Sequence, residues 1–201
     1  GAYGAETSDV LTQVYLYERA TRAALWVPAA DLELAYRYSN LKFTGRGVVL
    51  AIELQLTTDG LSKPLRFGQL TQNPGERRPV AEVREEVLAL RRSKGMVLDP
   101  EDHDTWSAGS FFTNPIVGPQ LADSIQEAVR ASRGDEDADH MPRHAVPSTT
   151  SEKKEKLSAA WLIERAGFAK GYPGVETGAR ATLSTKHTLA LTNRGEATAD
   201  D

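Results

Sequence analysis

The stretch Lys94-Gly-Met-Val-Leu-Asp-Pro-Glu-Asp-His-Asp-Thr-Trp-Ser-Ala-Gly-Ser-Phe-Phe-Thr-Asn-Pro115 organises the rest of the chain. A glycine at position 109 lets the backbone approach a ligand closely, and Ser110 and Asn114 offer hydrogen-bonding side chains beside it. Phe111 and Phe112 are expected to anchor this segment in a core. The same residues also fit the start of a strand that only packs its two aromatic rings, because short motifs often match by chance.

Working outward, an amphipathic helix is predicted on each side of this stretch. Residues 80–94 place apolar side chains on one stripe, with acidic residues early and basic residues late, as the helix dipole favours. Gly95 can end this helix in the left-handed region, which presents Lys94 beside the motif. Lys94 either compensates the dipole alone or adds a positive charge near an active site. Residues 119–133 predict the second helix, with Gly134 at its end.

The residues before these helices predict strands joined by turns. Residues 10–17 and 24–27 read as two strands, and residues 47–56 as a long buried strand. A polar connection at residues 73–78 marks a domain boundary.

After the second helix the pattern becomes irregular. Residues 135–151 predict a mobile loop, with His140 and His144 in solvent. A third helix is predicted from Ser151 as its cap through residues 152–156 and beyond. The turn at residues 169–174 can reach a ligand, and residues 188–192 predict a short buried strand.

Composition narrows the functional classes. The chain has 201 residues and a net charge of −4, which argues against a nucleic-acid surface. It has no cysteine, which excludes disulfides and cysteine metal sites. No apolar run has the length of a membrane span, and no signal peptide opens the chain, so a cytoplasmic location is expected. His103 lies among carboxylates at positions 99–104, but the spacing fits no standard metal site, and we predict a solvated turn and no metal.

At four places the chain resembles a known family. Gly109-Ser110-Phe111-Phe112 followed by Asn114-Pro115 resembles the signature of UDP-N-acetylenolpyruvoylglucosamine reductases, flavoenzymes of bacterial peptidoglycan synthesis. Tyr36-Arg37-Tyr38-Ser39 with Lys42, and the block Lys-Leu-Ser-Ala-Ala-Trp-Leu-Ile-Glu at residues 156–164, agree in the right order. The opening Gly1-Ala2-Tyr3-Gly4 resembles the flavin-domain turn of the family.

The resemblance implies an α+β fold. Residues 1–72 would be the later half of an FAD-binding domain, and residues 73–201 an α+β substrate-binding domain with helices on a small antiparallel sheet. Both ends of the family protein are expected to be missing from this chain. The oligomeric state is left open.

The resemblance also implies a reaction and its residues. NADPH would reduce FAD, which would reduce the enolpyruvyl double bond of a UDP-sugar to give UDP-N-acetylmuramate. Ser110 would donate the proton, and Arg37 would hold the substrate carboxylate and the negative charge that develops there. The other implied contacts are to substrate, from Tyr36, Lys94, Asn114 and His187, and to FAD, from the backbone of Gly1, Ala2, Tyr3 and Gly4.

Several positions depart from the family pattern. A second acid of the family, a glutamate near its C-terminus, has no counterpart here, and Phe67 stands where many members have a tyrosine that meets the substrate diphosphate. Thr113 replaces a common lysine, and Ala160 a common glycine. The chain alone is therefore expected to be inactive.

Two other functions remain open from the sequence alone. One is a non-catalytic piece that binds the nucleotide sugar without holding flavin. The other is a serine hydrolase built on Ser110, against which stand the missing Gly-x-Ser-x-Gly elbow and the lack of an identifiable histidine with an orienting carboxylate.

Overall fold

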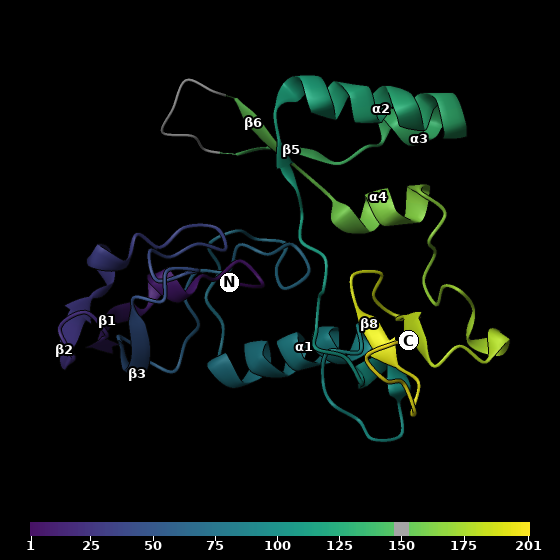
Figure 1. The fold of residues 1–201 in the computed structure, drawn as a ribbon. Helices are drawn as coiled ribbons and strands as arrows, with labels where there is room; N and C mark the ends of the chain where they lie inside the picture. Colours follow the sequence, from purple (N-terminus) through teal and green to yellow (C-terminus); the bar gives the residue numbers. More distant parts are fainter. Residues whose placement is uncertain (147–152) are drawn as a thin grey trace. The chain divides into compact units, whose positions relative to one another are not determined.

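The computed structural model of the chain describes residues 1–146 and 153–201 and has an α+β fold with small antiparallel sheets (Figure 1). It consists of two compact units, Gly1–Val87 and Leu88–Asp201. The domain boundary expected at residue 72 precedes this division, and it stays a prediction, because compactness alone does not define a functional domain. None of the helices in the two described ranges is both long and apolar enough to cross a membrane.

The first unit is built on a three-stranded antiparallel sheet in the order β2-β1-β3. Its strands are β1 (Leu11–Glu18), β2 (Ala23–Pro28) and β3 (Gly47–Leu54), with short 3₁₀ helices η1 (Thr7–Asp9) and η2 (Ala29–Leu32) around them. Val14 and Leu16 from β1 pack with Val27 and Leu32 to form the core of this unit. The two strands predicted at residues 10–17 and 24–27 are thus confirmed.

The third predicted strand forms, but its predicted burial is wrong. β3 pairs only with β1 and is an edge strand of the sheet. Its apolar side chains point to both faces, and Leu50 and Ile52 are each 54% exposed. A continuous apolar run is typical of a strand covered on both faces. Within this chain, however, the core forms between β1, β2 and η2 instead.

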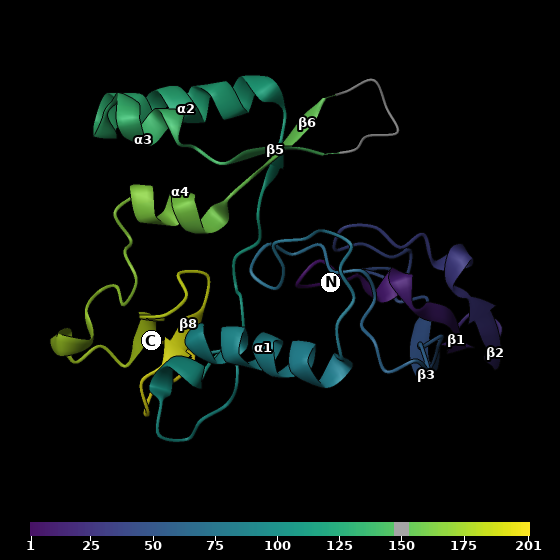
Figure 2. The same cartoon turned by 180° about the vertical axis from the view of Figure 1, so that it is seen from behind.

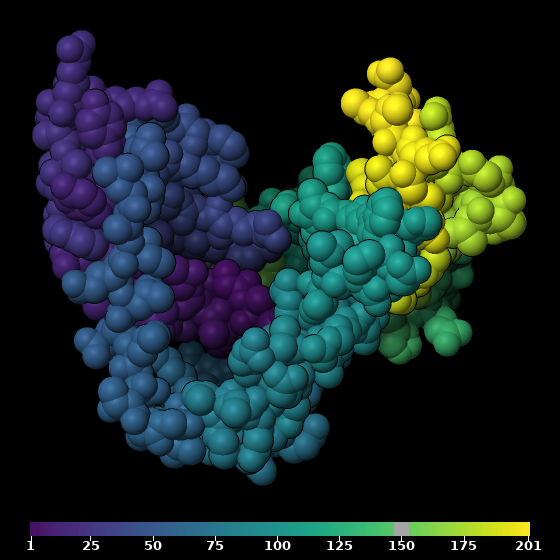
Figure 3. All heavy atoms as spheres, turned by 90° about the horizontal axis from the view of Figure 1, so that it is seen from below, coloured from purple at the N-terminus to yellow at the C-terminus, as the bar shows by residue number. Residues whose placement is uncertain are grey.

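Helix α1 (Val80–Ser93) confirms the first predicted helix. No residue of α1 is buried, and its blue-teal atoms lie on the surface seen in Figure 3. The helix ends in a Schellman motif, since the N–H groups of Gly95 and Met96 donate to the carbonyls of Arg92 and Arg91 at 3.0 and 2.8 Å. Gly95 has a φ of +67°, as predicted for a left-handed helix end.

The second unit contains helices that pack on a second antiparallel sheet. The strands are β4 (Ile116–Val117), β6 (Lys154–Leu157) and β5 (Arg143–Val146), in that order. α2 (Pro119–Arg133) packs beside α3 (Asp135–Asp139), as both views show (Figures 1 and 2). Ala122 of α2, Met141 and Leu157 of β6 form the core. The helix predicted at residues 119–133 and its end at Gly134 are confirmed.

Two predictions in the following region are wrong. Of the predicted loop at residues 135–151, residues 135–146 have regular structure, because α3 and β5 occupy most of them. Residues 147–151 lie outside the described ranges. The predicted helix at residues 152–156 is also wrong, because residues 154–157 pair with both neighbouring strands as β6. The predicted cap Ser151 lies outside the described residues. The helix begins later, as α4 (Ala159–Arg165), and its N-cap is Ser158.

The C-terminal part of the second unit holds a two-stranded sheet of β7 (Ala181–Leu183) and β8 (Leu191–Asn193). The hydroxyls of Thr182 and Thr192 meet across it at 3.1 Å, and both residues are buried. β8 is shorter than the strand predicted at residues 188–192, and it begins later. Two 3₁₀ helices, η3 (His103–Thr105) and η4 (Val175–Thr177), complete the unit.

We expect Gly95→Ala to lower the free energy of unfolding by about 3 kcal/mol, because the new methyl group combines backbone strain with a steric clash. A Cβ at this position would lie 2.7 Å from the carbonyl oxygen of Asp104. Gly134 is the matched control: it also ends a helix at positive φ, but a Cβ there would meet nothing within 4 Å.

Urea unfolding measures both variants. Gly134→Ala should cost about 1 kcal/mol, from backbone strain alone. Equal losses at the two glycines would contradict the close approach of Gly95 to Asp104.

Candidate active site

Ser110 and His187, both predicted as site residues, are brought together by the second unit. Ser110 Oγ lies 3.0 Å from His187 Nε2, although 77 residues separate them in the chain. The backbone around Ser110 is tied to the same loop, because Ser110 bridges to Ala190 and Phe111 N–H donates to the carbonyl of Leu189 at 2.7 Å. The contact between hydroxyl and imidazole is therefore fixed through both main chain and side chain.

The loop that carries His187 is held by a buried serine. Ser184 is fully buried, and its Oγ accepts the backbone N–H groups of Lys186 and His187 at 3.0 and 3.1 Å. The carbonyl of His187 accepts from Ala190 N–H at 3.0 Å, which closes the loop from the other side. These bonds fix the backbone from which the imidazole projects.

Asp104 lies beneath this loop, and its burial corrects the prediction of a fully solvated acidic turn. The residue is only 5% exposed. Its carboxylate accepts the N–H of Thr185 at 2.9 Å and Arg194 Nη1 at 3.1 Å, together with the hydroxyl of Thr185. Asp104 thus joins the acidic turn to the loop that bears His187.

Two pKa shifts follow from this environment. Burial lowers the pKa of His187 below its usual value, and the positive charges of Lys94 and Lys170 lower it further. Burial alone would raise the pKa of Asp104, but the hydrogen bonds from Thr185 and the charge of Arg194 outweigh it and hold that pKa below its usual value. At neutral pH the site therefore contains a neutral imidazole and an ionised carboxylate.

The remaining predicted residues of the second unit have different surroundings. Lys94 is close enough to influence the charge of His187. Asn114 Oδ1 accepts the backbone N–H of Ala159 at 3.0 Å, so this side chain secures the first residue of α4. Phe111 is 68% exposed, which makes its predicted anchoring role wrong, whereas Phe112 is half-buried and lines an apolar hollow with Leu162.

In the first unit, Tyr36 and Arg37 lie on a tight turn closed by two hydrogen bonds between Ala35 and Tyr38, at 3.0 and 3.1 Å. Arg37 has a φ of +53°, and Lys42 Nζ donates to its carbonyl at 2.8 Å. A hollow of about 780 Å³ is lined by this turn and by Gly1. Among the described residues, the guanidinium of Arg37 has no hydrogen-bond or ion-pair partner.

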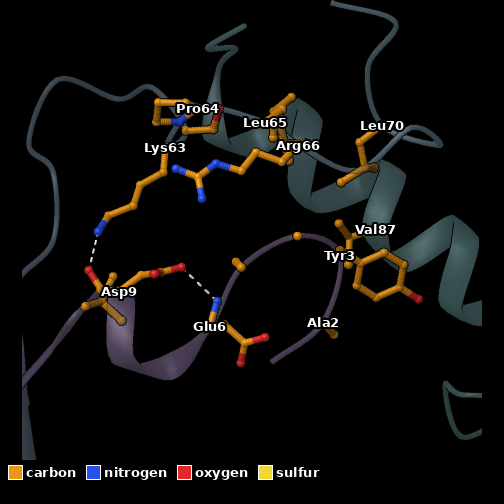
Figure 4. A pocket seen from close by; sticks show the side chains of 15 residues that line it. Ala2, Tyr3, Glu6, Asp9, Lys63, Pro64, Leu65, Arg66, Leu70 and Val87 are labelled. Carbon is orange, nitrogen blue, oxygen red and sulfur yellow. Dashed lines mark hydrogen bonds between the residues drawn. The ribbon is translucent and has the colours of Figure 1, made fainter. Parts of the chain in front are cut away.

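The predicted flavin-binding turn lines a second cavity of the first unit, of about 510 Å³ (Figure 4). Ala2, Tyr3 and Gly4 form one wall, opposite Lys63 and Arg66. Leu65, Leu70, Val83 and Val87 form an apolar part of the lining, and the acidic Glu6 and Asp9 also line the cavity. An apolar wall with cations at its rim is compatible with part of a flavin nucleotide, which has an apolar ring system and an anionic diphosphate.

Within the described ranges, no three His, Asp or Glu side chains gather closely enough to hold a metal ion. The acidic turn uses its carboxylates otherwise: Asp102 pairs with Lys186, and His103 stacks edge-on against Trp106 with ring centroids 4.7 Å apart.

Sequence reasoning missed Asp104 and Ser184, and it noted Lys170 only as part of a turn. The local signal at Asp104 is an acidic cluster, which usually lies in solvent. Nothing in the neighbouring residues reveals that Thr185 and Arg194 become its partners.

We expect His187 to titrate below pH 6.5, its ordinary pKa, and Lys94→Met or Lys170→Met to raise that pKa, because each removes a positive charge that opposes protonation. NMR titration of the imidazole signals measures it, with Lys154→Met as a control on β6. A wild-type midpoint at or above 6.5, or one that neither substitution moves, would contradict the described surroundings.

We expect Asp104→Asn to lower the free energy of unfolding at neutral pH by about 2 kcal/mol, because hydrogen bonds to a charged, buried acceptor are lost. Since the folded pKa lies below the ordinary value of 3.8, this stabilisation is complete above pH 3.8 and is lost as the pH falls through the folded pKa. Denaturation at several pH values should show the gap to wild type closing in acid. Asp99→Asn, at an exposed carboxylate, serves as control, and a gap that stays constant in acid would argue against an ionised Asp104.

Comparison with known proteins connects these features to one family. Residues 99–201 match the family model described as UDP-N-acetylenolpyruvoylglucosamine reductase, C-terminal domain. The chain is 62% identical over 208 residues to UDP-N-acetylenolpyruvoylglucosamine reductase 2 of Corynebacterium glutamicum, covering 100% of this chain and 53% of that protein.

Two further relatives carry the name UDP-N-acetylenolpyruvoylglucosamine reductase. The protein of Corynebacterium diphtheriae is 63% identical over 203 residues, covering 100% of this chain and 50% of the relative. That of Nocardia farcinica is 51% identical over 205 residues, covering 100% and 51%. The chain spans about half the length of these curated relatives. On these matches, the chain belongs to the UDP-N-acetylenolpyruvoylglucosamine reductase family.

Proposed function

We propose that the protein containing this chain reduces the enolpyruvyl group of UDP-N-acetylglucosamine enolpyruvate to give UDP-N-acetylmuramate, a step of peptidoglycan precursor synthesis. FAD would be its bound cofactor and NADPH the source of electrons. Membership of the reductase family supports the substrate and the reaction. The single observation that carries the proposal at the level of the site is the contact between Ser110 and His187.

Ser110 is proposed to protonate the substrate. Bound flavin would supply hydride to one carbon of the double bond, and the neighbouring carbon would then need a proton. A serine hydroxyl is a weak acid, so positioning matters more than a matched pKa. The Ser110 O–H bond breaks as the new C–H bond forms, and solvent then restores the proton to Ser110. The fixed hydroxyl, the neutral imidazole and the nearby lysines suit this role.

Arg37 is proposed to bind the substrate carboxylate. Its guanidinium offers a planar fork of donors that matches a carboxylate, and it has no other partner in the described part of the chain. The positive φ of Arg37 costs energy in a residue with a side chain, and such strain is often retained where it positions a functional group. The same cation would stabilise the negative charge that develops on the carboxylate during reduction.

The first unit is proposed to be the later half of the FAD-binding domain, and the second to belong to the substrate-binding domain. Residues 1–4 would bind flavin through the turn that lines the cavity in Figure 4. Tyr36, Lys94, Asn114 and His187 would contact or orient the substrate.

Two alternatives make different predictions. The chain alone could bind the nucleotide sugar without holding flavin, since it spans about half the length of its relatives. A serine hydrolase gains support from the contact between His187 and Ser110, a pairing that was not predicted from the sequence. However, no hydrogen bond to His187 Nδ1 is made by any described residue, so the orienting carboxylate of a catalytic triad is missing there.

We expect the full-length protein to bind flavin and to consume NADPH steadily only when the enolpyruvyl UDP-sugar is present. Ser110→Ala should leave reduction of flavin by NADPH nearly unchanged and slow reduction of the sugar by at least about a thousandfold, because only the second half-reaction needs the proton. Stopped-flow absorbance of the flavin separates the two halves.

Ser107→Ala, a nearby hydroxyl deletion, controls for general disturbance of the segment. Equal loss of both half-reactions in Ser110→Ala would reject Ser110 as proton donor. Labelling of Ser110 by a serine-directed phosphonate would instead favour the hydrolase.

A further inference from the structure

We propose that Asp104 is a positioning residue for the Ser110 hydroxyl, acting through the loop at residues 184–187, and that His187 holds this hydroxyl as an Nε2–H donor. The inference rests on the proposed function and extends it to a carboxylate that lies outside the family motif and is not required to touch the substrate. It assigns His187 a role through Ser110, beyond the substrate contact implied by the resemblance.

The first step runs from Asp104 to the loop. A buried carboxylate needs several donors, and this one takes them from Thr185 and Arg194. Thr185 contributes both its backbone N–H and its hydroxyl. Asp104 thereby fixes Thr185, the residue that directly follows Ser184 in the loop.

The second step runs from Ser184 to His187. The oxygen of Ser184 accepts the N–H groups of Lys186 and His187 at 3.0 and 3.1 Å. Asp104 holds Thr185, which lies between Ser184 and Lys186 in the chain, through both its N–H and its hydroxyl. Loss of the carboxylate would release Thr185 and loosen the two bonds to the Ser184 oxygen. The backbone of His187 therefore depends on the charge at Asp104.

The third step runs from His187 to Ser110. Nε2 and Oγ are 3.0 Å apart, and either atom can be the donor. If Ser110 donates to Nε2, its hydrogen is occupied and cannot reach a substrate carbon. If Nε2–H donates to Oγ, the hydroxyl hydrogen is free for the substrate, and the imidazole stabilises the oxygen as it gains negative charge. Proton donation by Ser110 requires the second arrangement.

The surroundings of the imidazole favour that arrangement. The tautomer of a histidine is set by the partner of its other nitrogen. No described residue accepts a hydrogen bond from Nδ1, so nothing in these ranges stabilises an Nδ1–H. Lys94 and Lys170 are the charged groups that act on this ring, and both are cations. They favour a neutral ring over a protonated one.

The tautomer is read by ¹⁵N NMR of the full-length protein labelled at histidine, with His187→Gln to assign the signals. We expect a protonated Nε2 and an unprotonated Nδ1 at neutral pH in wild type. In Asp104→Asn, we expect the His187 signals to move or broaden, because the loop is no longer fixed. The opposite tautomer in wild type would overturn the role of His187.

Kinetics test the role of Asp104. We expect Asp104→Asn and Ser184→Ala to slow reduction of the enolpyruvyl sugar by about tenfold to a hundredfold in kcat, with little change in KM, because misplacement of a reacting group affects the chemical step. Reduction of flavin by NADPH should be unchanged. Asp99→Asn is the matched control, an exposed carboxylate of the same segment, and should match wild type in both half-reactions.

A folded Asp104→Asn with wild-type sugar reduction and unchanged His187 signals would overturn the proposal. Should that variant fail to fold, Ser184→Ala decides between the outcomes. It removes the bonds from Lys186 and His187 to the Ser184 oxygen and leaves Asp104 with Thr185 and Arg194. If the wild-type protein does not reduce the sugar, the proposed function fails, whereas the NMR response of His187 to Asp104→Asn still supports or rejects the positioning.

Discussion

The buried carboxylate of Asp104 is the constraint on which the second unit depends. An ionised carboxylate that leaves water must gain donors in the protein, or the folded state becomes much less stable. Asp104 gains them from Thr185, which is 81 residues away in the chain, and from Arg194, 90 residues away. Because these bonds form only when both segments are in place, one charged group joins the acidic turn, the loop at residues 184–187 and the end of β8.

The same constraint explains how Ser110 and His187 meet. Ser110 follows the acidic turn, and His187 follows the loop that Asp104 holds. Once Asp104 joins the two segments, little freedom remains between hydroxyl and imidazole, and the bridge between Ser110 and Ala190 removes more. A hydroxyl that acts as an acid gains most from such restriction, since its intrinsic acidity is low and orientation must compensate. Under the proposed function, the same hydrogen bonds that stabilise this unit also orient the hydroxyl.

Features set by local patterns could be predicted from the sequence. The two long helices have an apolar stripe and a glycine at their ends, and both were found where expected. Residues 154–157 have good helix formers, yet they form a strand because Arg143 of β5 pairs with Glu155 and both neighbouring strands bond to them. The burial of Asp104 was not predicted for a related reason, because it depends on partners that are distant in the sequence. The motif around Ser110 identified the hydroxyl, but it gave no indication that Asp104 secures the loop that carries His187.

Arg37 and Ser110 are presented by the same physical device in separate units. In each case the backbone is secured by nearby hydrogen bonds while the functional head is kept out of the core. The carbonyl of Arg37 accepts from Lys42, and its turn is closed by Ala35 and Tyr38, which over-determines a backbone conformation that an arginine would otherwise avoid. A guanidinium fixed at its base but unsatisfied within the described residues is suited to an anion from outside the chain. A hydroxyl fixed in the same way is suited to a basic carbon, and the proposed reaction needs one of each.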